Sequence, residues 1–113
     1  MEMNFEVLPT GTMLVTLTGK LDLKAALEID QPFMEQVTSH TAVIVDMTAV
    51  DFLASMGLRT LVLAAKRIHA KLGRLVLLNP REDVLAVLIA SGVDTLLPVF
   101  QDRAAAEERV KGL

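Results

Sequence analysis

The stretch that decides the fold is residues 42–58, which read AVIVDMTAVDFLASMGL. Its first four residues, Ala42-Val43-Ile44-Val45, are all apolar, which is typical of a central strand buried on both faces. Residues Ser55 to Leu72 are instead predicted to form a helix, because apolar side chains recur there at helical spacing. The predicted core face of this helix carries Leu58, Leu61, Val62, Ala65, Ile68 and Leu72. A buried strand followed by an amphipathic helix predicts an α/β fold.

The residues that follow this helix continue the alternation of strands and helices. Gly73 is predicted to be the C-terminal cap of the helix, because glycine tolerates the left-handed conformation that often ends a helix. Pro80 is predicted to lie in the first turn of the next helix, where its missing N–H costs little. The predicted elements are a strand at Leu75–Leu78, a helix from Asn79-Pro80 to Ser91-Gly92, a strand at Leu96–Phe100 and a charged helix at Gln101–Val110.

The N-terminal side is predicted to add an antiparallel hairpin and one more helix. Pro9-Thr10-Gly11 is a typical turn between strands at Phe5–Leu8 and Thr12–Thr18, and it places the hairpin at one edge of the sheet. In the second strand Met13, Val15 and Leu17 alternate with Thr12, Leu14, Thr16 and Thr18, so the two sets face opposite sides. Residues Lys24–Val37 are predicted to be helical, with Leu23, Ala26, Leu27, Met34 and Val37 on one face and a break near Asp30-Gln31 caused by Pro32.

Length and composition restrict the class of protein. The 113 residues fit one domain spanning 1–113, with a mostly parallel sheet packed against helices. A formal charge of −3 and the absence of a basic stripe argue against nucleic-acid binding. The chain has no cysteine, and its longest apolar run, Val84–Ala90, is far short of the roughly 18 residues that span a membrane. We therefore expect a cytoplasmic protein without membrane insertion, metal or cofactor, either a monomer or a homodimer.

Candidate functional residues follow the predicted strands at one edge of the sheet. Because functional groups collect at the carboxyl ends of parallel strands, we expect Gly19–Asp22, Asp46–Asp51 and Ala54–Gly57 to converge. Ser55 lies at a strand-to-helix junction, where free backbone N–H groups and the helix dipole would stabilise a phosphate on its hydroxyl. The alternative is that Ser55 only caps the helix.

The same residues resemble the motifs of a known family. The whole chain resembles a STAS domain, the family of anti-sigma factor antagonists. Gly19-Lys20-Leu21-Asp22 is similar to the family's Gly-x-Leu-Asp loop after the second strand. Asp51–Leu58 is similar to its hallmark, an apolar bridge followed by Asp-Ser-Ser/Thr-Gly-Leu, and Leu88–Phe100 is similar to its late apolar-Ser-Gly segment and final strand. The resemblance implies a single-domain STAS fold.

The resemblance also implies a function and a set of site residues. An anti-sigma kinase phosphorylates the first hydroxyl residue of the family motif, which is Ser55 here, and phosphorylation ends binding to the anti-sigma factor. We therefore expect a non-catalytic protein that binds an anti-sigma factor or serine kinase. The docking surface implied around Ser55 contains Asp22, Asp51, Met56, Gly57 and Arg59. Two positions depart from the motif, because Ala54 replaces an aspartate and Met56 replaces a second hydroxyl residue.

Each of these residues has an alternative role. Asp22 would equally serve as the cap of the helix that follows it, and Asp46 and Asp51 would end a strand and close a turn. Arg59, with Lys66 and Arg67, would either contact an acidic partner or form a solvated helix face. His69 is expected to be a packed or boundary histidine rather than a metal ligand.

Three other functions remain as alternatives. The departures at Ala54 and Met56 favour a scaffold that is not phosphorylated, within a transporter or signalling complex. A phosphoacceptor receiver built on Asp46 would need an acidic pair after the first strand and a lysine after a later strand, and neither is present. A small enzyme is disfavoured because no nucleophile and base can be paired with confidence.

Overall fold

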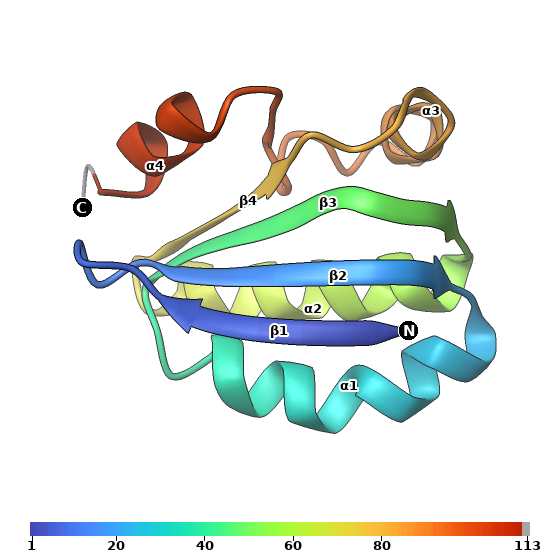
Figure 1. The fold of residues 1–113 in the computed structure, drawn as a ribbon, viewed down its shortest axis with the longest axis horizontal. Helices are drawn as coiled ribbons and strands as arrows, with labels where there is room; N and C mark the ends of the chain where they lie inside the picture. Colours follow the sequence, from blue (N-terminus) through green and yellow to red (C-terminus); the bar gives the residue numbers. More distant parts are fainter. Residues whose placement is uncertain (112–113) are drawn as a thin grey trace.

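A five-stranded mixed sheet, in the order β1-β2-β3-β4-β5, forms the centre of the computed structural model, which describes residues 1–111 (Figure 1). β1 pairs antiparallel with β2 at one edge, and the other neighbours pair in parallel. The predicted edge hairpin and mostly parallel sheet are therefore confirmed. The strands are β1 (Glu2–Val7), β2 (Met13–Leu21), β3 (Ala42–Leu53), β4 (Arg74–Leu78) and β5 (Val99–Phe100).

The sheet separates two apolar clusters of unequal size. The larger cluster joins one sheet face to the helices α1 (Leu23–Val37), α2 (Ser55–Ala70) and α3 (Glu82–Ala90). The smaller cluster joins the other face to α4 (Arg103–Lys111), which Figure 1 shows apart from α1 and α2. The alternation predicted for the second strand is confirmed, because Met13, Val15 and Leu17 belong to the larger cluster and Leu14 to the smaller one.

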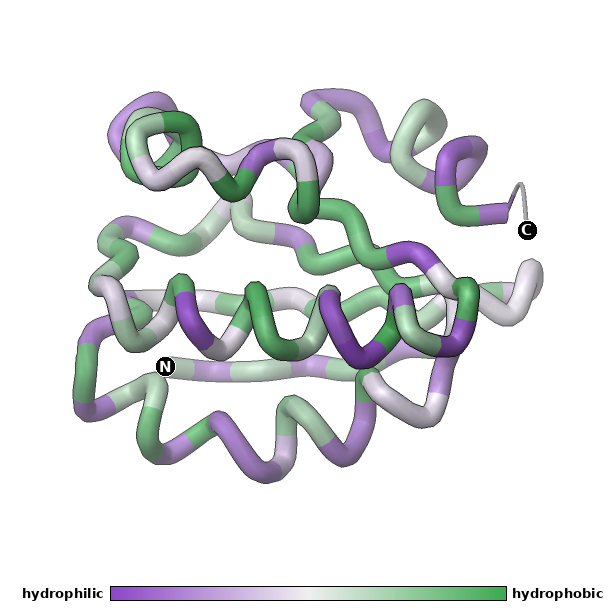
Figure 2. Tube along the Cα trace, turned by 180° about the vertical axis from the view of Figure 1, so that it is seen from behind, coloured by the Kyte–Doolittle hydropathy of each residue, from purple (hydrophilic) through white to green (hydrophobic). Residues whose placement is uncertain are grey.

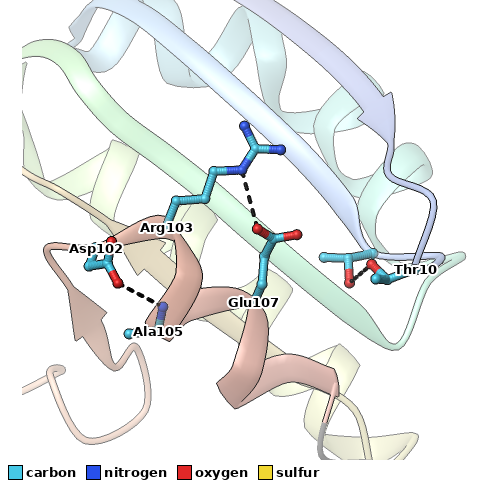
Figure 3. Close-up of polar contacts among 6 residues, drawn as sticks. Thr10, Asp102, Arg103, Ala105 and Glu107 are labelled. Carbon is cyan, nitrogen blue, oxygen red and sulfur yellow. Dashed lines mark hydrogen bonds and ion pairs between the residues drawn. The ribbon is translucent and has the colours of Figure 1, made fainter.

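The terminal helix α4 is held by local polar contacts and by two buried side chains. The Asp102 carboxylate accepts a hydrogen bond from the Ala105 N–H at 3.1 Å, and Arg103 pairs with Glu107 at 3.5 Å (Figure 3). Ala106 and Val110 are the helix residues that are fully buried against the sheet. None of the helices within residues 1–111 has both the length and the apolar character needed to cross a bilayer.

The central strand β3 is longer than the apolar run that predicted it. It continues through Asp46–Asp51, so the prediction that Asp46 and Asp51 end a strand and close a turn is wrong. The pairing of β3 with β2 shifts register twice, between Thr16 and Thr18 and between Gly19 and Lys20 of β2. Such bulges break the two-residue alternation without ending the ladder, which explains why polar residues interrupt the strand. The Asp46 carboxylate accepts from the Thr48 N–H at 3.0 Å at the first bulge.

The predicted break in the first helix is wrong, because α1 is continuous with Pro32 inside it. Proline removes one helix hydrogen bond, whose acceptor would be the carbonyl of Glu28. Pro32 and Glu28 are both exposed, so water can solvate that carbonyl. Buried side chains on the other face hold the helix across the proline, among them Ile29 and Phe33.

The end of α2 also differs from the prediction. Leu72, not Gly73, adopts the left-handed conformation, with φ of 62°, and its side chain is 86% exposed, so it does not belong to the core face. A Cβ at residue 73 would lie 2.5 Å from the carbonyl oxygen of Thr41, so this position needs glycine for a close backbone approach. His69 is exposed rather than packed.

Two further boundaries shift in the C-terminal part. α3 begins at Glu82, two residues after Pro80, because the backbone is still extended at the N-cap residue Arg81, with ψ of 159°. The last strand is reduced to Val99–Phe100, because Pro98 precedes it and only two residue pairs join it to β4. The C-terminal end of α3, before Ser91-Gly92, is as predicted, and the last helix begins two residues later than predicted, at Arg103.

Candidate docking site around Ser55

The site lies where β2 and β3 end side by side and their following helices begin. Leu21 pairs with Leu53 in the sheet, and the Ala54 N–H donates to the Leu21 carbonyl at 2.9 Å. The chain therefore brings the segment Gly19–Asp22 next to Ala54–Gly57, as the sequence predicted. α1 starts directly after the first segment and α2 within the second, so two helix N-termini lie at this edge of the sheet.

Ser55 is the first residue of α2, and it is exposed. The N-cap position belongs to Ala54, whose methyl side chain makes no capping hydrogen bond. The alternative that Ser55 serves as the helix cap is therefore wrong. Its hydroxyl stands next to the first N–H groups of α2, which lack acceptors within the helix. A negatively charged group on this hydroxyl would be favoured by those donors and by the helix dipole.

Gly57 makes this arrangement sterically possible. A Cβ at this position would lie 2.5 Å from Leu21 Cγ and 2.8 Å from the Leu21 carbonyl oxygen. The absence of a side chain thus allows the first turn of α2 to pack directly on the end of β2. Because Gly57 is buried, it shapes the site from below, and its part in partner binding stays a prediction.

Asp22 is the N-cap of α1. Its carboxylate oxygen Oδ1 accepts a hydrogen bond from the Ala25 N–H at 2.9 Å, and its backbone is extended, as a capping residue requires. The capping role considered for Asp22 is therefore confirmed, and its role in docking stays a prediction. The residue is half-buried, so part of it also reaches the surface beside Ser55.

The remaining predicted residues differ in their exposure. Asp51 and Arg59 are exposed, whereas Met56 is half-buried and packs against the larger apolar cluster. Met56 is therefore only partly available to a partner. Met56 and Arg59 line a hollow of about 180 Å³ between α1 and α2, together with Leu27 and Asp30 of α1.

Three exposed apolar side chains near this edge were missed by the sequence interpretation. Leu23 and Leu27, on the first turns of α1, are 55% and 64% exposed, although their spacing placed them on the predicted core face. Phe52, which pairs with Lys20 across β2 and β3, is 49% exposed. Exposed apolar side chains of this size are available for contact with another protein. The sequence contains a signal that could have identified Phe52 as exposed. Phe52 directly precedes Leu53, which faces the core, and neighbouring side chains of a strand point to opposite faces.

These features define a small α/β domain with an exposed serine at the start of the helix that follows its central strand. The family model described as STAS domain matches residues 6–106. The chain therefore belongs to the STAS domain family, and the resemblance seen in the sequence is confirmed.

Similar proteins agree with this assignment. BtrV of Bordetella bronchiseptica, a proposed anti-sigma factor antagonist, is 29% identical over 102 residues, which cover 89% of this chain and 88% of BtrV. A crystal structure of a proposed anti-sigma factor antagonist from Thermotoga maritima covers 96% of this chain and 94% of its own, with a TM-score of 0.88 and 17% identity. The structure of the phosphorylated form of the Bacillus cell-fate determinant SpoIIAA matches 96% of this chain and 99% of SpoIIAA, with a TM-score of 0.73 and 22% identity. The two solved structures establish the likeness of the fold.

Proposed function

We propose that this chain acts as an anti-sigma factor antagonist, a protein-binding module whose partner is an anti-sigma factor or serine kinase that docks around Ser55. Phosphorylation of Ser55 ends the binding. The observation that carries the proposal is the exposed position of Ser55 as the first residue of α2, beside the end of β2 and free of a capping role. BtrV, a relative that is itself a proposed anti-sigma factor antagonist, supports this function.

The physical basis of the switch is the charge that phosphorylation adds. A phosphate on Ser55 brings about −1.5 to −2 charges at pH 7. The N-terminus of α2 tolerates this charge, so the folded state remains stable. A partner that covers a neutral serine would instead have to desolvate the phosphate without a counter-charge, which weakens its binding. SpoIIAA, a protein of the same fold that is solved in a phosphorylated form, supports this part of the proposal.

The test uses the anti-sigma kinase encoded nearest to this gene, mixed with the full chain and ATP. We expect a mass increase of one phosphate in the wild type and in Ser91→Ala, which removes another exposed serine. We expect no increase in Ser55→Ala. Binding of the unmodified chain to the kinase should be lost after phosphorylation. A kinase that binds the chain but leaves Ser55 unmodified would reject the switch.

The alternative is a STAS scaffold subunit of a transporter or signalling complex that is not phosphorylated. The observation that favours it is the pair of apolar residues Ala54 and Met56 on either side of Ser55, which offers a kinase no carboxylate or second hydroxyl. In that case Ser55→Ala leaves partner binding unchanged, and a transporter subunit co-purifies with the chain. Co-purification of an anti-sigma factor with the chain would exclude the scaffold hypothesis.

A further inference from the structure

The solvent face of α2 carries cations and aliphatic side chains in a single stripe. Arg59, Lys66 and Arg67 are exposed, and Val62 and Leu63 between them are half-buried. These five residues, which we call the α2 stripe, follow the spacing of one helix face. α2 contains no acidic residue at all, although the chain as a whole has a net charge of −3. The stripe therefore concentrates positive charge on one side of an acidic protein.

The cations of the α2 stripe form no ion pair within residues 1–111, although Asp30 and Glu35 of α1 line the same hollows as Arg59 and Arg67. Within residues 1–111, ion pairs join Arg81 to Asp83, Arg103 to Glu107 and Lys111 to Glu108, and none involves the stripe. The acidic residues across the groove on α1 have other donors. The Thr60 hydroxyl donates to Asp30 at 3.3 Å, and the Gln31 amide donates to Glu35 at 3.0 Å. The cations of the stripe are therefore available to a partner.

A shallow groove between α1 and α2 is lined by three residues of the stripe, Arg59, Leu63 and Arg67. Two hollows, of about 180 and 290 Å³, share Asp30 and Leu63, and together they extend from Met56 to Arg67. At 1.5 Å per residue, that stretch of α2 is about 17 Å long, which is the length of a helix of three turns. Figure 2 shows α1 and α2 side by side, with hydrophobic and hydrophilic bands alternating along both.

We propose that the α2 stripe and its groove bind an acidic amphipathic helix of the partner protein. Its aliphatic face packs on Val62 and Leu63, and its carboxylates meet Arg59 and Arg67. Asp30, on the opposite wall of the groove, repels carboxylates and so orients the acidic flank toward α2. The inference rests on the proposed function in one respect, since it assumes that the partner that docks around Ser55 also contacts the α2 stripe. An anionic membrane is a less suitable occupant, because its uniform negative charge would also face Asp30 and Glu35 of α1, whereas a helix can present its carboxylates to α2 alone.

The test uses two stapled synthetic helices, each with leucines along one face, one with glutamates on the flanks and one with lysines. We titrate each into the 15N-labelled full chain and follow the backbone amide resonances. We expect saturable shifts confined to α2 and the facing side of α1 for the glutamate peptide, and no such shifts for the lysine peptide. Affinity should fall with added salt, because the contacts are between exposed charges.

Charge variants provide the matched comparison. Arg67→Glu should weaken binding of the glutamate peptide by about tenfold, and Arg67→Gln should have a smaller effect. Lys24→Glu changes the net charge equally at an exposed position of α1 outside the groove, and it should leave the affinity unchanged. Equal binding of both peptides, an unaffected Arg67→Glu variant, or binding to anionic vesicles in preference to the peptide would overturn the proposal. Phosphorylation of Ser55 is measured in a separate experiment. A result against peptide binding at the α2 stripe can therefore be told apart from a result against the phosphorylation switch.

Discussion

At the scale of single residues, the site separates side chains that support the fold from side chains that face a partner. Gly57 and Asp22 belong to the first kind, because one allows α2 to pack on Leu21 and the other caps α1. Ser55 belongs to the second kind, since it is exposed at the start of α2 without capping it. The motif identified all three residues from the sequence. The sequence did not show which of them support the fold and which face a partner, because this depends on how close β2 lies to α2.

Asp22 allows the two kinds of role to be measured apart. Asp22→Ala removes the acceptor for the Ala25 N–H, and we expect it to lower the free energy of unfolding by about 1 kcal/mol. Asp22→Asn keeps an acceptor oxygen and should stay close to the wild type in urea denaturation. If Asp22 also contacts the partner through its charge, Asp22→Asn weakens partner binding while the stability is retained. Equal stability of the alanine variant and the wild type would contradict the capping role.

At the scale of elements, apolar periodicity predicted which elements form but not where they end. The run Ala42–Val45 identified the central strand, yet β3 extends to Leu53, because two bulges allow polar residues inside the ladder. The helix α2 was predicted to reach Leu72, but its last helical residue is Ala70, since the chain turns there with a left-handed leucine. The first difference arises from the pairing of β3 with β2, and the second from the left-handed Leu72 and the close approach of Gly73 to Thr41. A single segment of sequence contains neither kind of information.

The continuous α1 gives a prediction at this scale. Proline in a helix interior is less favourable than alanine by about 3 kcal/mol, and part of this cost is offset because proline restricts the unfolded chain. Pro32 is exposed, so its replacement removes no core packing. We therefore expect Pro32→Ala to raise the free energy of unfolding by about 1 to 2 kcal/mol in urea denaturation. Gln31→Ala, at the neighbouring exposed position, should change it far less. Destabilisation by Pro32→Ala would mean that α1 needs the proline.

At the scale of the whole molecule, the two faces of the sheet are protected very unequally. Three helices cover the face with the larger cluster, and the other face depends on α4. The continuous apolar run Ala42–Val45 predicted a strand that is buried on both faces, and the charged helix at Gln101–Val110 was predicted in nearly the right place. Its contact with the sheet could not be predicted, because it is made by small or isolated apolar residues in a polar sequence, such as Ala106 and Val110.

Val110 is therefore a sensitive point of the fold. It is fully buried in the smaller cluster, and a helix of nine residues such as α4 is not stable in water without tertiary contacts. In Val110→Asp an unpaired carboxylate would be buried, so we expect α4 to detach and the free energy of unfolding to fall by about 2 to 4 kcal/mol. Amide hydrogens of α4 should exchange rapidly, and a hydrophobic dye should bind the uncovered sheet face. Ala105→Asp introduces the same charge at an exposed position of α4 and should retain protection. Protected α4 amides in Val110→Asp would show that the helix is held mainly by other contacts, such as the 2.8 Å hydrogen bond from Arg74 to the Arg109 carbonyl.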